Sequence, residues 1–460
     1  MSNSIYYLSK WCKSFVQGDE VALFHVLLFG LVFMSKSDKE WLFKHKNGVS
    51  FDDVVLRFGE SSDLLIANGL LVESLESDEG LIQSMRFDLS QNIYLDLMYL
   101  LLTDGCNLKC RYCFEDTPNA PSFHAKHMTK QVAIAALHSF ARLTQKYGSS
   151  DGKRIIHLYG GEPLLNQKVL RAVVEEVDIM KFSGELPDNT NVVIVTNGTL
   201  LTVEMAQFFA KHQVTIGISL DGPKNINNVY RIAKNKHTDA FESVVNAYNI
   251  ARDAGVTVGL SVTLTPEVVQ NFDEVLDYFV NDLKISDGLS FNIMHFNPAV
   301  NLDDNYFELA SQCLIKSFER FRELGVYEER MMRKAMAFTS GQPIFSDCGV
   351  NGNQIVIAPD GMIGVCQDFV KPRTYFQGSV LDSSFDPVAE GLFNDWKNRS
   401  PFFMDACINC EAVAMCGGGC PASVELKTGN RWNIDERICP HSKQSLEWLV
   451  WQAYNNVMSE

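Results

Sequence analysis

From Asp96 onward, short apolar runs rich in β-branched residues alternate with longer stretches whose apolar positions recur at helical spacing. Alternating strands and helices are typical of parallel βαβ units, in which helices cover the outside of the sheet. We therefore expect an α/β fold whose chemistry lies in the loops after the strands. The six expected strands are Asp96 to Leu102, Arg154 to Tyr159, Asn191 to Val195, Thr215 to Leu220, Val256 to Leu264 and Leu289 to His295.

Three cysteines follow the first expected strand in the run Cys106-Asn-Leu-Lys-Cys110-Arg-Tyr-Cys113. Three thiolates suit a four-iron cluster in which one iron keeps an open coordination position. Such an iron can bind and reduce a substrate or cofactor, whereas a fully ligated cluster mainly transfers electrons. A fragment of a zinc site is the alternative for this triplet, and the motifs further along the chain favour the cluster.

Residues suited to a small polar ligand stand at the ends of the next three expected strands. Glycine lets a backbone approach a ligand closely, a carboxylate accepts hydrogen bonds from an ammonium group, and an arginine can bind a carboxylate. Ordinary turn chemistry is the alternative for each of them. The residues are Gly160, Gly161 and Glu162 after the second strand, Thr196 and Asn197 after the third, and Ser219 and Arg231 after the fourth.

The cysteine triplet, the aromatic Tyr112 before its last cysteine and the Gly-Gly-Glu-Pro motif after the second strand resemble the radical S-adenosylmethionine (SAM) superfamily. The resemblance implies an open partial (β/α)6 barrel and a [4Fe-4S] cluster on the triplet, with SAM bound at its fourth iron. Reductive cleavage of SAM then yields methionine and a 5′-deoxyadenosyl radical, which abstracts a hydrogen atom from substrate.

The resemblance also implies roles for the residues at the strand ends. Thr196 and Asn197 are expected in the same SAM site, and Thr263 is a weaker candidate near the adenine. Gly160, Gly161 and Glu162 would hold the amino group of SAM, and Ser219 and Arg231 would bind its ribose hydroxyls and carboxylate.

A second set of cysteines begins at Cys348, and the stretch from Ile355 to Cys366 predicts a hairpin that turns at Pro359-Asp360-Gly361. This set resembles the seven-cysteine SPASM extension of radical SAM enzymes that modify peptides and proteins, with a zinc ribbon as the alternative. The resemblance implies two auxiliary [4Fe-4S] clusters, and so three clusters in all. One would be held by Cys407, Cys410, Cys416 and Cys439, and the other by Cys348, Cys366 and Cys420.

The second auxiliary set is one ligand short, because the stretch from Phe338 to Asp347 contains no cysteine. Either one iron is open, or Asp347 or another non-cysteine group completes the cluster. The two remaining cysteines, Cys12 and Cys313, are expected to be small buried hydrophobes.

Residues 1 to about 90 do not follow the βα alternation. Apolar runs at Val26 to Phe33, Phe51 to Phe58 and Leu64 to Val72 suggest strands, a short helix pair and a closing β element. This pattern resembles a winged-helix-like recognition element that binds the leader of a peptide substrate, and a structural cap on the barrel is the alternative. The expected domains are this α+β module (1–90), the barrel (91–310), a helical bridge (311–347) and the SPASM extension (348–460).

The formal charge of −16 argues against a nucleic-acid partner, since phosphate binding needs clustered Lys and Arg. The longest apolar run, Val21 to Met34, contains His25, is too short to cross a bilayer and reads as a buried strand pair or helix. No secretion signal precedes this run, so we expect a cytoplasmic protein without a membrane. Twelve cysteines in such a chain indicate metal ligation more than disulfides.

The combined architecture predicts a maturase that modifies, and specifically crosslinks, side chains of a ribosomally made precursor peptide. Flavodoxin or ferredoxin is the expected electron donor. The alternatives are an anaerobic sulfatase-maturing enzyme, which forms formylglycine, and a non-enzymatic metal-binding scaffold. No residue is assigned as general acid or base, although Glu115, Asp116 and His295 follow strand ends and can face the cavity.

Overall fold

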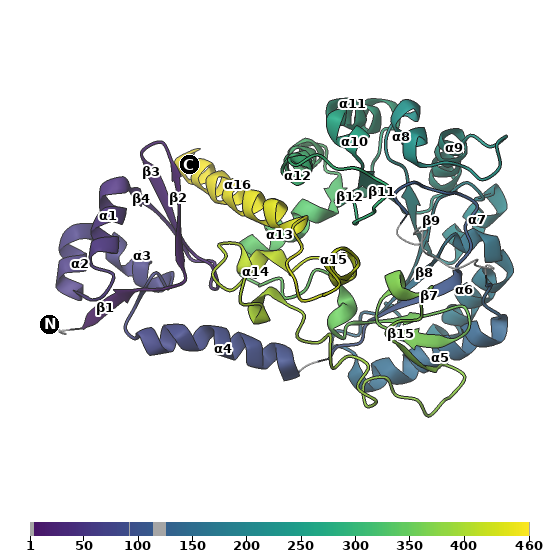
Figure 1. The fold of residues 1–460 in the computed structure, drawn as a ribbon, viewed down its shortest axis with the longest axis horizontal. Coiled ribbons are helices and arrows are strands. Elements are labelled where there is room, and N and C mark those ends of the chain that lie inside the picture. Colours follow the sequence, from purple (N-terminus) through teal and green to yellow (C-terminus); the bar gives the residue numbers. More distant parts are fainter. Residues whose placement is uncertain (1–3, 92, 114–125, 460) are drawn as a thin grey trace.

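A ten-stranded sheet runs through most of the computed structural model, which describes residues 4–91, 93–113 and 126–459 (Figure 1). Its six central strands are all parallel, and they confirm the strands expected from sequence to within a residue or two. The α/β fold class with its barrel-like parallel sheet is therefore confirmed. The strands are β7 (Leu97–Thr103), β8 (Ile155–Gly160), β9 (Asn191–Thr196), β10 (Thr215–Ser219), β11 (Val258–Leu264) and β12 (Gly288–Ile293).

Helices between these strands cover the outer face of the sheet (Figure 1). Along β11, residues alternate between buried and half-buried, because one side packs on the helices and the other faces the barrel interior. The Thr129 side chain accepts a hydrogen bond from the Val132 amide and so caps the N-terminus of the first barrel helix, which begins at Lys130. The helices are α5 (Lys130–Tyr147), α6 (Gln167–Phe182), α7 (Val203–Lys211), α8 (Lys224–Tyr230), α9 (Ala240–Asp253), α10 (Pro266–Gln270) and α11 (Phe272–Asp277).

Strands from the C-terminal part of the chain extend the barrel sheet at both edges. β13 (Tyr327–Glu328) pairs in parallel with β12, and β14 (Gln354–Ile357) pairs in parallel with β7. β14 continues into antiparallel β15 (Met362–Gly364) and β16 (Phe376–Ser379). The predicted hairpin is confirmed, and its turn uses Gly361 at φ +87°.

The N-terminal residues form an α+β module outside the ten-stranded sheet. The run from Val21 to Met34 is a strand pair, whereas a strand over Val26 to Phe33 is wrong, because the turn of the hairpin lies inside that run at Phe29 (φ +60°). The helix pair and closing strand are confirmed. The elements are β1 (Ile5–Leu8), β2 (Cys12–Gln17), β3 (Glu20–His25), β4 (Leu31–Ser35), α1 (Lys36–Lys44), β5 (Val49–Ser50), α2 (Phe51–Phe58), α3 (Ser61–Ala67) and β6 (Leu71–Val72).

The module reaches the rest of the chain through α4 (Leu75–Gln91) and through an aromatic contact with the C-terminal helix α16 (Ile438–Ser459) (Figure 1). Phe33 packs against Trp451 and Tyr454, and Phe24 stacks on Phe338. The other C-terminal helices are α12 (Tyr306–Glu323), α13 (Glu329–Ser340), α14 (Val413–Cys416) and α15 (Pro421–Thr428).

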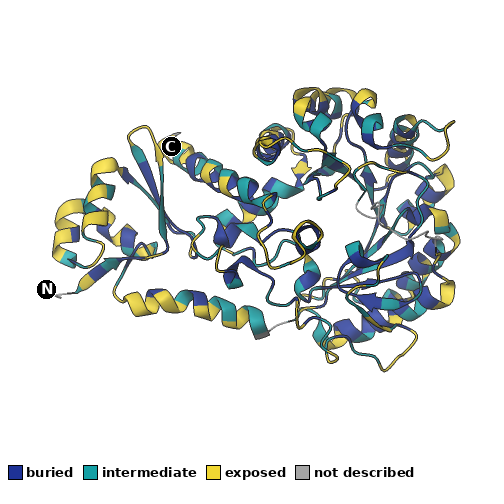
Figure 2. Ribbon diagram, in the orientation of Figure 1, coloured by how far each residue is buried: buried dark blue, intermediate teal, exposed yellow. Residues whose placement is uncertain are grey.

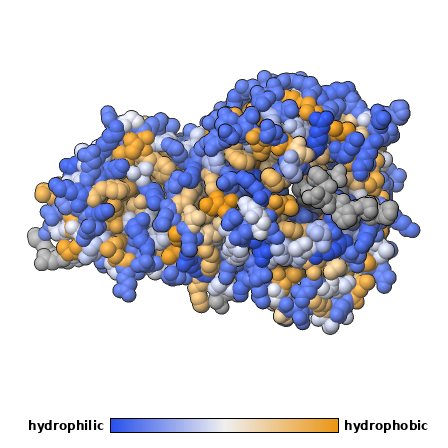
Figure 3. Space-filling model, viewed as in Figure 1, coloured by the Kyte–Doolittle hydropathy of each residue, from blue (hydrophilic) through white to orange (hydrophobic). Residues whose placement is uncertain are grey.

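Burial follows this architecture. The strands of the barrel are mostly dark blue in Figure 2, whereas the outer faces of α2 and α4 are exposed. Hydrophilic side chains cover much of the face seen in Figure 3. Within the described ranges, no helix combines the length and hydropathy needed to span a bilayer.

Candidate active site

The loop that carries the cysteine triplet leaves the carboxyl end of β7 and is held against the segment that follows α8. The amides of Lys109 and Arg111 donate to the carbonyls of Ile232 (2.8 Å) and Tyr230 (3.0 Å). These bonds tie the loop to the segment that contains Arg231. The triplet loop thus follows the first barrel strand and lies beside the segments after neighbouring strands, as the sequence predicted.

The triplet thiols are half-buried and sit among hydrogen-bond donors. The Leu108 amide donates to Cys106 Sγ (3.4 Å), and the Asn197 side chain donates to the same sulfur (3.6 Å). Burial raises the pKa of Cys106 to about 11, and the charges of Glu162 and Cys110 add to this rise. Because a metal binds the thiolate, iron that loads here displaces protons.

The two glycines of the Gly-Gly-Glu-Pro motif pack directly on the start of the triplet loop. A Cβ on Gly160 would lie 2.0 Å from the Thr103 carbonyl oxygen, and one on Gly161 would lie 2.4 Å from that of Gly105. The amides of Gly161 and Glu162 donate to these same carbonyls, both at 2.9 Å. Only glycine allows the second strand end to approach the triplet loop this closely.

The carboxylate of Glu162 is fully buried and joins two strand ends. It accepts hydrogen bonds from the Thr196 hydroxyl (2.7 Å), the Asn197 amide (2.8 Å) and the Leu164 amide (2.9 Å). Burial raises the pKa of Glu162, and the three hydrogen bonds partly offset this rise. Three of the roughly four acceptor positions of a carboxylate are thus used inside the protein, which leaves about one for a ligand amine.

Arg231, Tyr112 and Asp221 form a buried chain of hydrogen bonds behind the triplet. Arg231 Nη1 donates to the Tyr112 hydroxyl (2.7 Å), which donates to Asp221 Oδ2 (2.7 Å). Asp221 Oδ1 accepts from the Thr263 amide (2.8 Å). The Nε of Arg231 is buried and has no acceptor among the described residues, so the guanidinium can still bind a ligand carboxylate.

A cavity of about 400 Å³ in the barrel interior is lined by some of these residues and by Cys420. Its walls carry both the expected SAM contacts and groups from the C-terminal region. Its lining includes Tyr112, Ser219, Arg231 and Thr263, and also His295, Arg333, Asp347, Asp368, Cys420 and Arg437.

The four cysteines expected to share one auxiliary cluster are close enough to affect one another. Burial raises the pKa of Cys407 to about 11 and that of Cys439 to about 12, and the charges of Cys410 and Cys416 contribute in both cases. Burial also raises the pKa of Cys366, and here the charges of Cys420 and Cys348 contribute. The C-terminal cysteines therefore form the two separate groups that the resemblance implied, and their ligand roles stay predictions.

A run of three glycines separates the two groups, because Cys416 belongs to one and Cys420 to the other. Gly417, Gly418 and Gly419 all adopt positive φ (+76°, +79° and +70°). A Cβ on Gly419 would lie 2.5 Å from Asp435 Oδ2, which accepts a hydrogen bond from the Cys420 amide at 2.8 Å. The run thus redirects the chain from one thiol group to the other.

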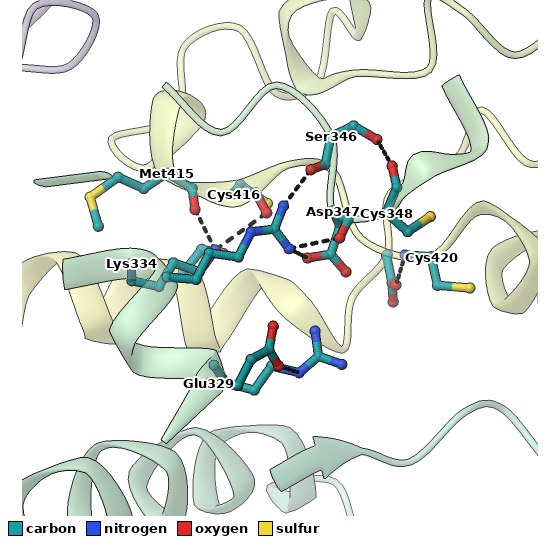
Figure 4. Close-up of polar contacts among 12 residues, drawn as sticks. Glu329, Lys334, Ser346, Asp347, Cys348, Met415, Cys416 and Cys420 are labelled. Carbon is teal, nitrogen blue, oxygen red and sulfur yellow. Dashed lines mark hydrogen bonds and ion pairs between the residues drawn. The ribbon is translucent and has the colours of Figure 1, made fainter. Parts of the chain in front are cut away.

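The Asp347 carboxylate is engaged by Arg333, although its charge also raises the pKa of Cys348. Its Oδ1 lies 3.1 Å from Arg333 Nη1, which also donates to the Asp347 carbonyl at 2.7 Å (Figure 4). Burial acts to raise the pKa of Asp347, but the charges of Arg330 and Arg333 outweigh it and lower this pKa. Lys334, beside them, donates to the carbonyls of Met415 and Cys416 (Figure 4).

The other candidate residues have mixed outcomes. Glu115 and Asp116 lie outside the described residues. His295 faces Asp368 at 3.5 Å, and Asp368 was missed because one carboxylate in a turn carries no sequence signal. Cys313 is buried in α12 and Cys12 is half-buried in β2, in keeping with packing roles.

Known proteins match most of this chain. Residues 100–279 match the model of the radical SAM superfamily. The radical SAM cyclopropyl synthase TigE of Paramaledivibacter caminithermalis is 22% identical over 90% of this chain and 85% of its own. The cysteine-type anaerobic sulfatase-maturating enzyme of Clostridium perfringens (strain 13 / Type A) is 26% identical over 78% of this chain and 98% of its own.

Solved structures show the same fold. AdoMet-bound anSMEcpe superposes with a TM-score of 0.62 at 21% identity and covers 78% of this chain and 98% of its own. SuiB of Streptococcus suis bound to S-adenosylmethionine gives a TM-score of 0.55 at 14% identity and covers 94% of this chain and 99% of its own. The matched segment is a radical SAM domain, and the chain is a radical SAM enzyme that resembles SPASM-type maturases.

Proposed function

We propose that this enzyme forms a carbon-carbon or thioether bond within a ribosomally made precursor peptide. The observation that carries the proposal is a cavity whose walls include the expected SAM contacts Ser219 and Arg231 and also Cys420 of the three-cysteine group. A substrate side chain in this cavity would lie between the source of the radical and a group able to accept an electron.

Three [4Fe-4S] clusters are part of the proposal, because the thiols fall into groups of three, four and three. When bound, the cluster at the triplet supplies the electron that splits SAM into methionine and a 5′-deoxyadenosyl radical. The protein orients SAM: Arg231 offers a buried donor to its carboxylate, and the glycine backbone and Glu162 receive its amino group. Ser219 lies on the cavity wall where a ribose hydroxyl can reach it.

Peptide recognition is assigned to the N-terminal module (residues 1–90). SuiB has also been solved bound to its precursor peptide SuiA, and that match covers 94% of this chain, the module included. A second, open groove of about 850 Å³ between the loop after β12 and α15 shares Arg437 with the barrel cavity. It offers a peptide a route to the cavity. The proposal also includes an external flavodoxin or ferredoxin as the electron donor and a cytoplasmic location for the enzyme.

The similarity to TigE supports bond formation between carbon atoms, because that relative is a cyclopropyl synthase and its match spans 90% of this chain. Closing a ring inside one side chain and joining two side chains both remove two hydrogen atoms. The first hydrogen atom is taken up by the 5′-deoxyadenosyl radical, which becomes 5′-deoxyadenosine. The second hydrogen leaves as a proton and an electron. Sulfatase maturation is the second candidate, and its relatives match 78% of this chain or less.

Mass spectrometry of a neighbouring precursor peptide co-expressed with the enzyme tests the proposal. We expect the peptide to lose two hydrogen atoms per turnover. Where two residues are linked, the fragment ions from backbone cleavage between them should be missing. An unchanged peptide mass with inverted residues would indicate epimerisation instead. Formylglycine on a co-expressed sulfatase, with the peptide unchanged, would favour the second candidate and reject the first.

Arg231→Lys is expected to raise the KM for SAM roughly 10- to 100-fold, because lysine keeps the charge but loses the forked donors that suit a carboxylate. The measurement is 5′-deoxyadenosine formation against SAM concentration in the reconstituted enzyme. Arg171→Lys is the matched control, since Arg171 pairs with Glu204 on the outer helices, and its KM should stay unchanged. An unaltered KM in Arg231→Lys would remove this residue from the SAM site.

A further inference from the structure

Asp368 is a buried carboxylate beside the three cysteines that lack a fourth ligand. It lies in the 3-10 turn Gln367–Phe369, which begins directly after Cys366. Its side chain is 2% exposed, and neither of its oxygens accepts a hydrogen bond from any residue in the described ranges. Burial of an ionised carboxylate is costly unless a cation or hydrogen-bond donors compensate it. This position therefore calls for a positive partner.

Apart from His295, the basic side chains that line the same cavity do not supply this partner. Each of them is bonded to another group within the described part of the chain, and His295 is the side chain that forms an ion pair with Asp368, at 3.5 Å. Arg330 donates to Asn292, Arg333 to Asp347 and the Ser346 carbonyl, Lys334 to the Met415 and Cys416 carbonyls, and Arg437 to Asp435.

The Asp368 carboxylate lies close to Cys420, and its charge affects all three thiols. Ligand atoms of His295, Asp368 and Cys420 all lie within 4.8 Å of one another, which is compatible with a shared metal. After burial, the charge of Asp368 is the largest influence that raises the pKa of both Cys366 and Cys420. Three thiols and a carboxylate that no Lys or Arg among the described residues engages form a donor set suited to iron.

We propose that the Asp368 carboxylate is the fourth ligand of the auxiliary [4Fe-4S] cluster held by Cys348, Cys366 and Cys420. His295 acts as its hydrogen-bond partner and orients the carboxylate. The inference rests on the auxiliary cluster of the proposed function. A cluster ligated at all four irons offers no site for a substrate thiolate, so this one transfers electrons and the peptide stays unattached to iron.

The test uses the full chain with the three triplet cysteines replaced by alanine, so that only auxiliary clusters are loaded, about eight irons per chain. Asp368→Asn is compared with Asp347→Asn, its matched control beside Cys348. One-electron oxidation by ferricyanide expels Fe²⁺ from a cluster with an open iron and leaves a [3Fe-4S] cluster. We expect the electron paramagnetic resonance signal of the [3Fe-4S] cluster in Asp368→Asn. The parent and the Asp347→Asn control should not give this signal.

Asp368→Cys should restore a four-ligand cluster that resists oxidation, and the Mössbauer spectrum of the parent should contain one iron with an oxygen ligand. The inference is overturned if Asp368→Asn resists oxidation like the parent, or if His295→Gln or Asp347→Asn gives the [3Fe-4S] signal instead. A parent that loads only about four irons would overturn both this inference and the three-cluster proposal. Peptide modification, measured separately with the triplet intact, reports on the proposed function.

Discussion

Alanine at Cys106, Cys110 and Cys113 together abolishes formation of 5′-deoxyadenosine and lowers the iron content by about four ions per chain. The reason is that these thiols are the donors grouped at the carboxyl end of β7, beside Arg231 and the glycine motif. The measurements are an iron assay and chromatography of SAM products after anaerobic reconstitution with a reductant. Because this change removes the source of the radical, we expect no residual turnover above background.

Cys12→Ala and Cys313→Ala are the controls for this experiment, since both thiols pack inside single elements away from the cavity. They should keep full iron content and SAM cleavage, with at most a small loss of stability. SAM cleavage by the triple variant at the parent rate would contradict the assignment of the triplet.

Gly160→Ala is expected to destabilise the protein by roughly 3 kcal/mol and to disable SAM binding. The new Cβ would meet the Thr103 carbonyl oxygen at 2.0 Å, and this backbone atom cannot move without shifting the triplet loop. The residue also has φ +126°, which L side chains rarely adopt. The midpoint of thermal unfolding of the iron-free chain measures the first effect, and equilibrium SAM binding to the loaded enzyme measures the second.

Gly255→Ala separates strain from collision, because Gly255 has φ +78° but nothing within 4 Å of its added Cβ. It should cost only about 1 kcal/mol and leave SAM binding intact. Gly80→Ala, in the exposed helix α4, should be neutral or stabilising by up to about 1 kcal/mol. If Gly160→Ala behaved like Gly255→Ala in both measurements, close packing of the motif on the triplet loop would not matter.

Local patterns were enough to predict the six barrel strands and the hairpin turn. β-branched runs separated by helical periodicity have few competing interpretations, and Pro359-Asp360-Gly361 requires a turn. The apolar run at Val26 to Phe33 was different, because its residues remain apolar through the turn at Phe29. Periodicity alone cannot locate a turn whose residues are themselves apolar.

Long-range pairing and partner choice were beyond the sequence. The parallel pairing of β14 with β7 joins residues far apart in the chain and leaves no local pattern. Asp347 directly precedes Cys348 and Asp368 follows Cys366 by two residues, and these positions alone do not tell which carboxylate is a ligand. The structure does, because Arg333 engages Asp347, whereas Asp368 is buried, faces His295 and accepts no hydrogen bond among the described residues.

The pairing of β14 with β7 also has a mechanical consequence. Backbone hydrogen bonds run without interruption from the barrel into the C-terminal region, so a hinge between them would have to break a strand ladder. The span between the triplet and the auxiliary thiols is therefore fixed, and a substrate must move relative to a stationary reaction centre. For the proposed function, the peptide is anchored at the distant N-terminal module. The number of residues between the anchored segment and the cavity then determines which residue reacts.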